Sequence, residues 1–251
     1  MPNSMLKGSV KYSLGNKWLF IIVLVQFMIF ETIHHVVGGI MESTSLIVLL
    51  IVLGYGLKVT QDVINGGESL PKIKLNELIN FGLKGTVVYT FYLTIQVSVL
   101  GLISILIDFP IFELEEFILN ISETIALFYE HNPINFIIFI LTGIITVYVT
   151  IFFMEIALAI LADGGKLKEA FNFPKIRDII STIGWNHYAI DYTKIVLAVV
   201  ILISLRSFFD SYSVLNFIVC VITDILAFVV EYRGIGNIYK EYANEMKEAI
   251  E

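Results

Sequence analysis

The sequence of 251 residues is poor in the residues that form disulfides and metal sites: it has one cysteine, Cys220, and four histidines. A single cysteine can form no intramolecular disulfide and no cysteine-based metal site. The motifs Gly-x-Ser-x-Gly and His-Glu-x-x-His and the phosphate-binding loop do not occur. We therefore expect no cofactor, no metal and no catalytic residue. An enzyme that used only carboxylates and tyrosines would escape these patterns, so the enzyme class stays open, leaning towards no activity.

Charged residues make up 16% of the chain, and their two signs alternate along it. The connection 108–133 has no Lys or Arg, and its charged side chains are all acidic. Most of the basic residues lie in the other connections and near the termini: Lys7, Lys11, Lys17, Lys72, Lys74, Lys166, Lys168, Lys175, Arg177, Arg233, Lys240 and Lys247. Only Arg206 stands in a predicted outer position. Loops rich in Lys and Arg face the cytoplasm in membrane proteins, so we expect both termini to be cytoplasmic. The net charge of −7 gives no indication of a nucleic-acid partner.

Six apolar runs fill most of the chain, which is 57% hydrophobic. They cover residues 18–37, 46–64, 85–107, 134–161, 190–209 and 214–232. Each is near the ~20 residues that a helix needs to cross a bilayer. We predict an all-α, multi-pass protein of the plasma membrane, with one integral membrane domain over 1–251, six transmembrane helices and a polar C-terminal helix at 237–251. Its first partner is then the lipid bilayer, and membrane protein partners or a homo-oligomer are further expectations.

Two of the runs end in the same way, with Asn65-Gly66-Gly67 and with Asp163-Gly164-Gly165. Glycine after Asn or Asp ends helices, because it accepts the positive φ that a turn away from the helix requires. Each turn is followed by a matching stretch, Pro71-Lys72-Ile73-Lys74 or Pro174-Lys175-Ile176-Arg177. We expect each proline in the first turn of a short amphipathic helix at the cytoplasmic interface, over 75–81 in the first copy.

The segment Arg233-Gly234-Ile235-Gly236 after the sixth run resembles a third, degraded copy of the turn. All three turns would lie on one side of the membrane, which predicts a parallel internal repeat of inward-pointing hairpins. The alternative is that glycine-rich turns with basic flanks are simply what inner loops look like.

The segments Gly54-Tyr55-Gly56, Asn65-Gly66-Gly67-Glu68-Ser69-Leu70-Pro71 and Gly82-Leu83-Lys84-Gly85 carry a resemblance to a known family. They resemble the Gly-Tyr, Asn-Gly-(Asp/Glu)-x-x-Leu-Pro and Asp-Gly-Leu-Lys pattern of a mostly archaeal family of multi-pass membrane proteins catalogued as a domain of unknown function. This chain departs from the pattern in having Lys72, Lys74 and Asn76 where the family has Trp and acidic residues, and Phe81 before Gly82. The resemblance implies a six-helix fold and supplies no activity, substrate or catalytic residue.

Three charged residues in the apolar runs, Lys58, Glu155 and Asp224, precede the glycines of their turns by similar lengths of helix. At 1.5 Å per residue they would share one depth in the membrane. Charges at such depth normally face the bundle interior and pair. We therefore predict a buried charge cluster, with Lys194 as a fourth member, that is either a binding or coupling site for a proton, cation or polar substrate or a fixed salt bridge. Lys58 and Lys194 could instead extend to the inner surface.

Two further features lie on the predicted outer side. Glu31, His34 and His35 contain half of a di-iron ligand motif, but a second half does not occur in the sequence, which favours imidazoles at a polar interface. Residues 113–130 alternate apolar and acidic faces at helical spacing, which predicts an interfacial helix with an anionic face.

Three classes of function remain from the sequence. The first is transport or permeation of a small solute, ion or lipid past the predicted charge cluster. The second is a non-catalytic accessory or scaffold subunit that binds partner helices through Gly54, Gly56, Gly82 and Gly85. A lipid-modifying membrane enzyme is the third and the least favoured.

Overall fold

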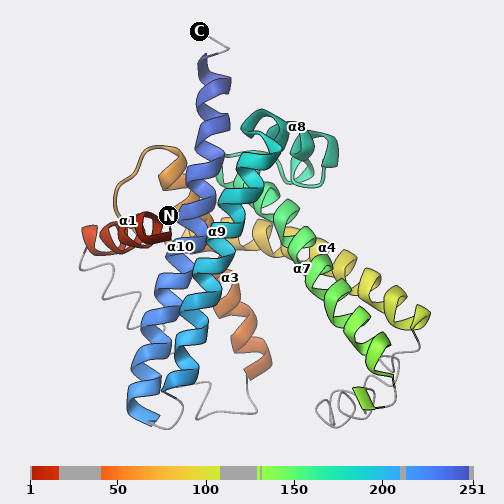
Figure 1. Cartoon of the computed structure of the whole chain (residues 1–251). Coiled ribbons are helices and arrows are strands. Elements are labelled where there is room, and N and C mark those ends of the chain that lie inside the picture. The colour runs from red at the N-terminus through yellow and green to blue at the C-terminus, as the bar shows by residue number, and fades with distance from the viewer. Residues whose placement is uncertain (1, 17–40, 108–128, 131, 210–212, 249–251) are drawn as a thin grey trace. The chain divides into compact units, whose positions relative to one another are not determined.

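A computed structural model describes residues 2–16, 41–107, 129–130, 132–209 and 213–248 of the chain. Within these ranges every secondary-structure element is a helix, which confirms the all-α class (Figure 1). The α-helices are α1 (Pro2–Gly15), α3 (Met41–Ile64), α4 (Leu75–Leu106), α7 (Pro133–Ala162), α8 (Phe173–Ile183), α9 (Trp185–Ser204) and α10 (Ser213–Glu248). Two short 3₁₀ helices, η1 (Leu167–Glu169) and η2 (Leu205–Phe208), follow α7 and α9.

Four of the described helices are long and apolar enough to cross a membrane: Leu75–Leu106, Pro133–Ala162, Trp185–Ser204 and Leu215–Glu245. They carry large apolar side chains that face outwards, such as Leu106, which is 83% exposed. Apolar surface of this kind is stable in lipid and costly in water. These helices therefore indicate a membrane protein, and they correspond to the third to sixth predicted runs. The first run lies outside the described residues, and the second falls within α3.

Contacts divide the chain into two compact units, one of Met1–Val88 with Glu155–Glu251 and one of Tyr89–Met154. In the second unit the amide of Asn135 donates to the carbonyl of Ile107 at 3.3 Å. The hydroxyls of Thr94, Ser98 and Thr142 donate to backbone carbonyls one turn earlier in their own helices. Each hydroxyl thus has a partner, as an apolar environment requires.

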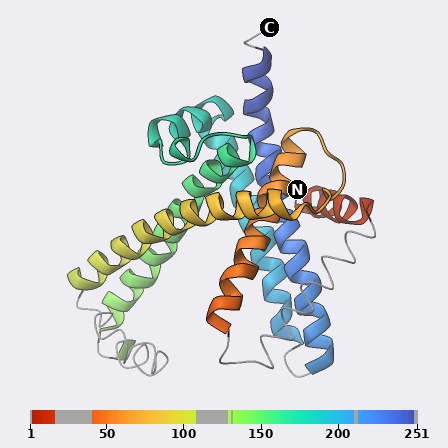
Figure 2. The same ribbon diagram turned by 180° about the vertical axis from the view of Figure 1, so that it is seen from behind.

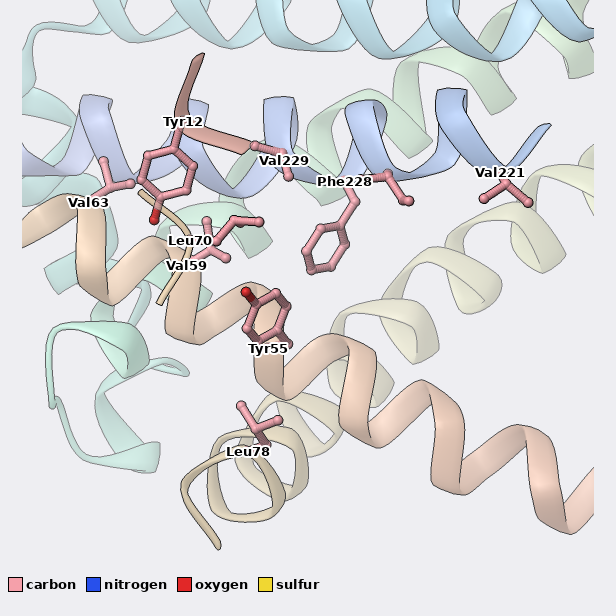
Figure 3. Packing of buried hydrophobic residues seen from close by; sticks show 10 residues of the cluster. Tyr12, Tyr55, Val59, Val63, Leu70, Leu78, Val221, Phe228 and Val229 are labelled. Carbon is pink, nitrogen blue, oxygen red and sulfur yellow. The ribbon is translucent and has the colours of Figure 1, made fainter. Parts of the chain in front are cut away.

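In the larger unit α10 is the central helix, with α3 and α9 packed along it (Figures 1 and 2). A buried apolar cluster joins α1, α3, the connection 65–74, the start of α4 and α10 (Figure 3). Its members are Tyr12, Tyr55, Val59, Val63, Leu70, Leu78, Val221, Ile225, Phe228 and Val229. The rings of Tyr55 and Phe228 stack with their planes 1° apart and their centroids 6.1 Å apart. This cluster holds in place the helices that carry most of the charged residues discussed below.

The same backbone cap ends α3 and α7. The amide of Gly66 donates to Val63 and that of Gly67 to Asp62, at 3.0 and 2.7 Å. After α7, Gly164 and Gly165 repeat both bonds with Leu161 and Ile160. This pair of bonds is the Schellman motif, which needs a residue of positive φ at its centre. Gly66 and Gly164 have φ of 88° and 90°.

The stretches that follow the two caps differ, so their predicted equivalence is wrong. Pro174 lies in the first turn of α8, whose N-cap Asn172 accepts a hydrogen bond from the backbone N–H of Lys175. Pro71 lies in a non-helical connection, and its carbonyl accepts a bond from the hydroxyl of Tyr55. The helix after it starts only at Leu75 and continues to Leu106 without a break. Residues 75–81 are thus the beginning of a long apolar helix and not a separate interfacial one.

The predicted third turn is also wrong, because α10 runs as one helix from Ser213 to Glu248. Residues 237–248, expected in a separate polar helix, are its continuation. The two glycines serve close packing: a Cβ on Gly234 would lie 2.6 Å from Ile195 of α9, and one on Gly236 would lie 3.0 Å from Val63 of α3. Glycine therefore lets neighbouring helices approach α10 here.

The amphipathic helix α8 turns its apolar face into the protein. Ile176, Ile179, Ile180 and Ile183 are all buried, at the three- and four-residue spacing expected for one helix face. The short amphipathic helix predicted after Pro174 is therefore present, and its apolar face packs inside the protein. α8 ends at Gly184, whose φ of 93° separates it from α9.

Candidate functional site

Three of the four residues predicted to form one buried cluster take separate partners. Lys58 on α3 pairs with Glu77 on α4, Glu155 on α7 with Glu231 on α10, and Lys194 on α9 with Asp191 one turn earlier. Asp224, the fourth, lies partly buried on α10. In place of one shared cluster, the described contacts thus place Lys58, Glu155 and Lys194 in three pairs.

Glu155 and Glu231 form the most unusual of these pairs, because both partners are acids. Their carboxyl groups are close enough to interact with each other, and Glu155 is only 3% exposed. Both residues lie on helices that are apolar enough to cross a membrane. A hydrogen bond between two carboxyl groups requires one of them to carry a proton, because an ionised carboxylate is only an acceptor.

Loss of that proton changes how close the two carboxyl groups can lie to each other. Two unit charges about 4 Å apart repel by roughly 4 kcal/mol at an effective dielectric constant of about 20. If the shared proton leaves, Glu155 and Glu231 must therefore separate or receive another cation. Protonation of this pair is for that reason linked to the contact between the C-terminal end of α7, from Glu155 onwards, and α10.

Lys58 is the centre of a second polar group. Its Nζ lies 2.6 Å from Glu77 Oε2 and donates to Gln61 Oε1 at 2.9 Å. The Gln61 amide donates in turn to the carbonyl of Ala162 at 3.0 Å, the last residue of α7. The final carbonyls of a helix have no partner within it, so Gln61 satisfies one of them. Through these bonds α3 connects the start of α4 to the end of α7.

A third polar contact fastens α1. The hydroxyl of Tyr12 donates to Asp62 Oδ2 on α3 at 2.9 Å, and the Arg233 guanidinium on α10 lies 5.8 Å from the centre of its ring. Burial, and after it the negative charge of Asp62, raise the pKa of the Tyr12 phenol. The phenol therefore stays protonated and remains a hydrogen-bond donor.

Polar groups at the start of α9 are closer to the surface. Asp191 accepts contacts from Lys194 at 2.5 Å and from His187 Nε2 at 2.9 Å. His187 also lies 3.9 Å from Glu241 on α10. With its side chain 53% exposed, His187 belongs to a solvated surface pair.

The glycines proposed as contacts for partner subunits are used inside the chain. A Cβ on Gly54 would lie 2.1 Å from the Leu78 carbonyl of α4, and one on Gly82 would lie 2.1 Å from the Leu50 carbonyl of α3. Gly56 faces the ring of Tyr232 on α10. These glycines therefore permit the crossings of the chain's own helices, and they give no support to the scaffold function.

Sequence reasoning missed both Glu77 and Glu231 as partners. Glu231 is the penultimate residue of the sixth run, directly before the basic segment that starts at Arg233, although a carboxylate inside an apolar run is itself a signal. Glu77 was assigned to a surface helix. Other candidates, Glu31, His34, His35 and the connection 108–128, lie outside the described residues.

Comparison with known proteins gives one match. Residues 38–223 match the family described as "Protein of unknown function (DUF4013)". The match includes Lys58, Glu155 and both glycine turns, whereas α1 and Glu231 lie beyond its ends. Among the curated proteins and the solved structures nothing matches. Because the match covers well over half of the chain, this protein belongs to the DUF4013 family of proteins of unknown function.

Proposed function

We propose that this protein transports a small solute or ion across the plasma membrane and that the Glu155–Glu231 pair couples this transport to protons. The observation that carries the proposal is a pair of neighbouring carboxyl groups, one of them buried, on two apolar helices. Ionisable residues inside membrane spans are costly, and in transporters they form proton relays and ion pathways. The protein is a single multi-pass domain with both termini in the cytoplasm under this proposal.

The pair suits coupling because its charge and its geometry change together. With one shared proton it carries one negative charge and holds the C-terminal end of α7 to α10. Without the proton, repulsion favours either separation of the helices or entry of a cation. A ligand that binds one arrangement better then shifts the protonation of the pair, and the proton shifts ligand binding by the same factor.

The first test asks whether the pair holds a proton at neutral pH. Infrared spectra of the purified full-length chain should show a protonated carboxyl band that disappears in both Glu155→Gln and Glu231→Gln. The matched control is Glu245→Gln, the same change at an exposed position of α10, which should keep the band. Because a glutamine amide can still donate a hydrogen bond to the remaining carboxylate, both variants should fold.

The second test measures proton movement. Liposomes containing the protein and an internal pH-sensitive dye are given a membrane potential, with and without Na⁺ or a mixture of small polar solutes outside. We expect proton entry in wild type and in Glu245→Gln, and entry at the rate of protein-free liposomes in Glu155→Gln. A wild-type rate equal to that of protein-free liposomes under all these conditions, or a folded Glu155→Gln that moves protons normally, would contradict the proposal.

A further inference from the structure

The N-terminal helix α1 has two faces of different character. Ser9, Tyr12 and Ser13 are buried against the larger unit. On the opposite side Val10 and Leu14 are 38% and 47% exposed, and Lys7 and Lys11 are exposed beside them. The outward residues, Lys7, Val10, Lys11 and Leu14, recur at three- and four-residue spacing and form one helix face, called here the outer face of α1.

The orientation of this face is set by contacts on the inner side. Tyr12 is held by Asp62 and covered by Arg233, as described above. A Cβ on Gly8 would lie 2.9 Å from the Arg233 guanidinium, so α1 lies directly against α10 at this point. Because α1 is fixed to both α3 and α10, it cannot turn its apolar outer residues inwards.

α1 lies where the apolar part of α10 ends. Its contact residue Arg233 comes directly after the apolar run 214–232, and the exposed residues that follow on α10 are polar: Asn237, Glu241, Asn244 and Glu245. α3 also ends at this level, since Val63 packs against Gly236. Figures 1 and 2 show α1 lying crosswise to α10 and to α9, which runs beside α10. A crosswise helix at the end of the apolar segments lies at the depth of lipid headgroups.

From this placement we infer that the outer face of α1 binds the anionic headgroups of the bilayer that the protein itself occupies. Val10 and Leu14 enter the boundary of the hydrocarbon, while Lys7 and Lys11 extend towards phosphate groups. The outward side of α8 provides a contrast: beyond Phe173 and Pro174 at its start, its exposed residues are Arg177, Asp178, Ser181 and Thr182, and its isoleucines are buried. This inference is independent of the carboxyl pair and of any transport.

The test follows α1 in the full-length chain. Val10→Cys is made in a Cys220→Ser background, labelled with a polarity-sensitive fluorophore, and placed in phosphatidylcholine nanodiscs with an increasing fraction of phosphatidylglycerol. We expect the emission to shift to the blue and quenching by aqueous iodide to fall as the anionic fraction rises. The half-point is the fraction of phosphatidylglycerol at which half of the emission shift is reached. Lys7→Gln or Lys11→Gln removes one lysine and should raise this half-point about fivefold.

Two controls make the result specific. Arg177→Gln removes an exposed cation from α8 and should leave the half-point unchanged, and high salt should raise the half-point in the parent protein. The inference fails if phosphatidylglycerol has no effect on emission or quenching, or if the lysine variants keep the parent half-point. It also fails if the shift depends on the number of protein copies per nanodisc, since a second copy of the chain then covers this face.

Discussion

Lys58 is a cation on which three helices depend, because it contacts α4 directly and α7 through Gln61. Its partner atom, Glu77 Oε2, is shielded from solvent. We expect Lys58→Met to lower the melting temperature of the protein in detergent, because that oxygen loses the cation beside it. Adding Glu77→Gln to the same chain should restore part of the loss, which a double-mutant cycle of melting temperatures would measure.

Lys194→Met is the matched control for this prediction. Its pair with Asp191 lies within one helix, and the Lys194 side chain is 39% exposed. Exposed pairs of this kind contribute only ~0–1 kcal/mol, so the melting temperature should change little. If the effects of Lys58→Met and Glu77→Gln simply add, the two residues are not coupled and the ion pair has no stabilising role.

The difference between the predicted and observed partners of Lys58 and Glu155 has a physical reason. Counting residues from a helix end gives the depth of a side chain, since each residue adds ~1.5 Å. The direction in which that side chain points depends on the rotation of its helix and on which helix lies beside it. Both are set by packing between distant segments, which one sequence does not reveal. The residues in the apolar runs were therefore found, whereas their partners were not.

At the level of helices, the crossing of α3 and α4 depends on two glycines. A Cβ on Gly54 or Gly82 would lie 2.1 Å from a backbone carbonyl of the other helix. A backbone atom cannot move aside without moving its helix, so Gly54→Ala and Gly82→Ala should each destabilise the chain. Overpacking of this kind costs about 1–3 kcal/mol. A lowered melting temperature in detergent would show it.

Gly101→Ala is the control, because a Cβ at that position of α4 meets nothing within 4 Å. Alanine is favoured over glycine inside a helix by ~1 kcal/mol, so this variant should melt at the same temperature or higher. If Gly54→Ala left the melting temperature of the monomer unchanged but dissociated an oligomer or a partner, the glycines would serve binding between chains after all.

Some elements follow from the sequence and others do not. The caps of α3 and α7 follow from Asn or Asp before two glycines, because positive φ is a local requirement. The unbroken α10 does not follow from the sequence. Gly234 and Gly236 are typical of a turn, and their role in close packing depends on neighbouring helices that the sequence does not identify. α1 was missed for a related reason: its 14 residues include three serines and two glycines, and Tyr12 becomes buried only by contacts with α3 and α10.

At the level of the whole molecule, the larger unit brings together the turns that follow α3 and α7 and the polar C-terminal half of α10. The glycine turn after α3 lies beside Lys240, since a Cβ on Gly66 would be 3.8 Å from its Nζ. Asp163, at the turn after α7, is close enough to act electrostatically on Tyr239. Two turns and the polar half of α10 therefore lie on one side, as required if the basic connections face a single compartment.

The orientation of that side is the last prediction. Basic residues concentrate in the connections that include 65–74 and 163–184, and the connection 108–133 has none, so the former should face the cytoplasm and the latter the exterior. In a Cys220→Ser background, Glu116→Cys should react with a membrane-impermeant thiol reagent added to intact cells. Lys168→Cys, at an exposed position of η1, should react only after the cells are broken. Because both variants carry a single thiol in the same protein, each is the control for the other, and the reverse labelling pattern would mean that the chain is inserted the other way round.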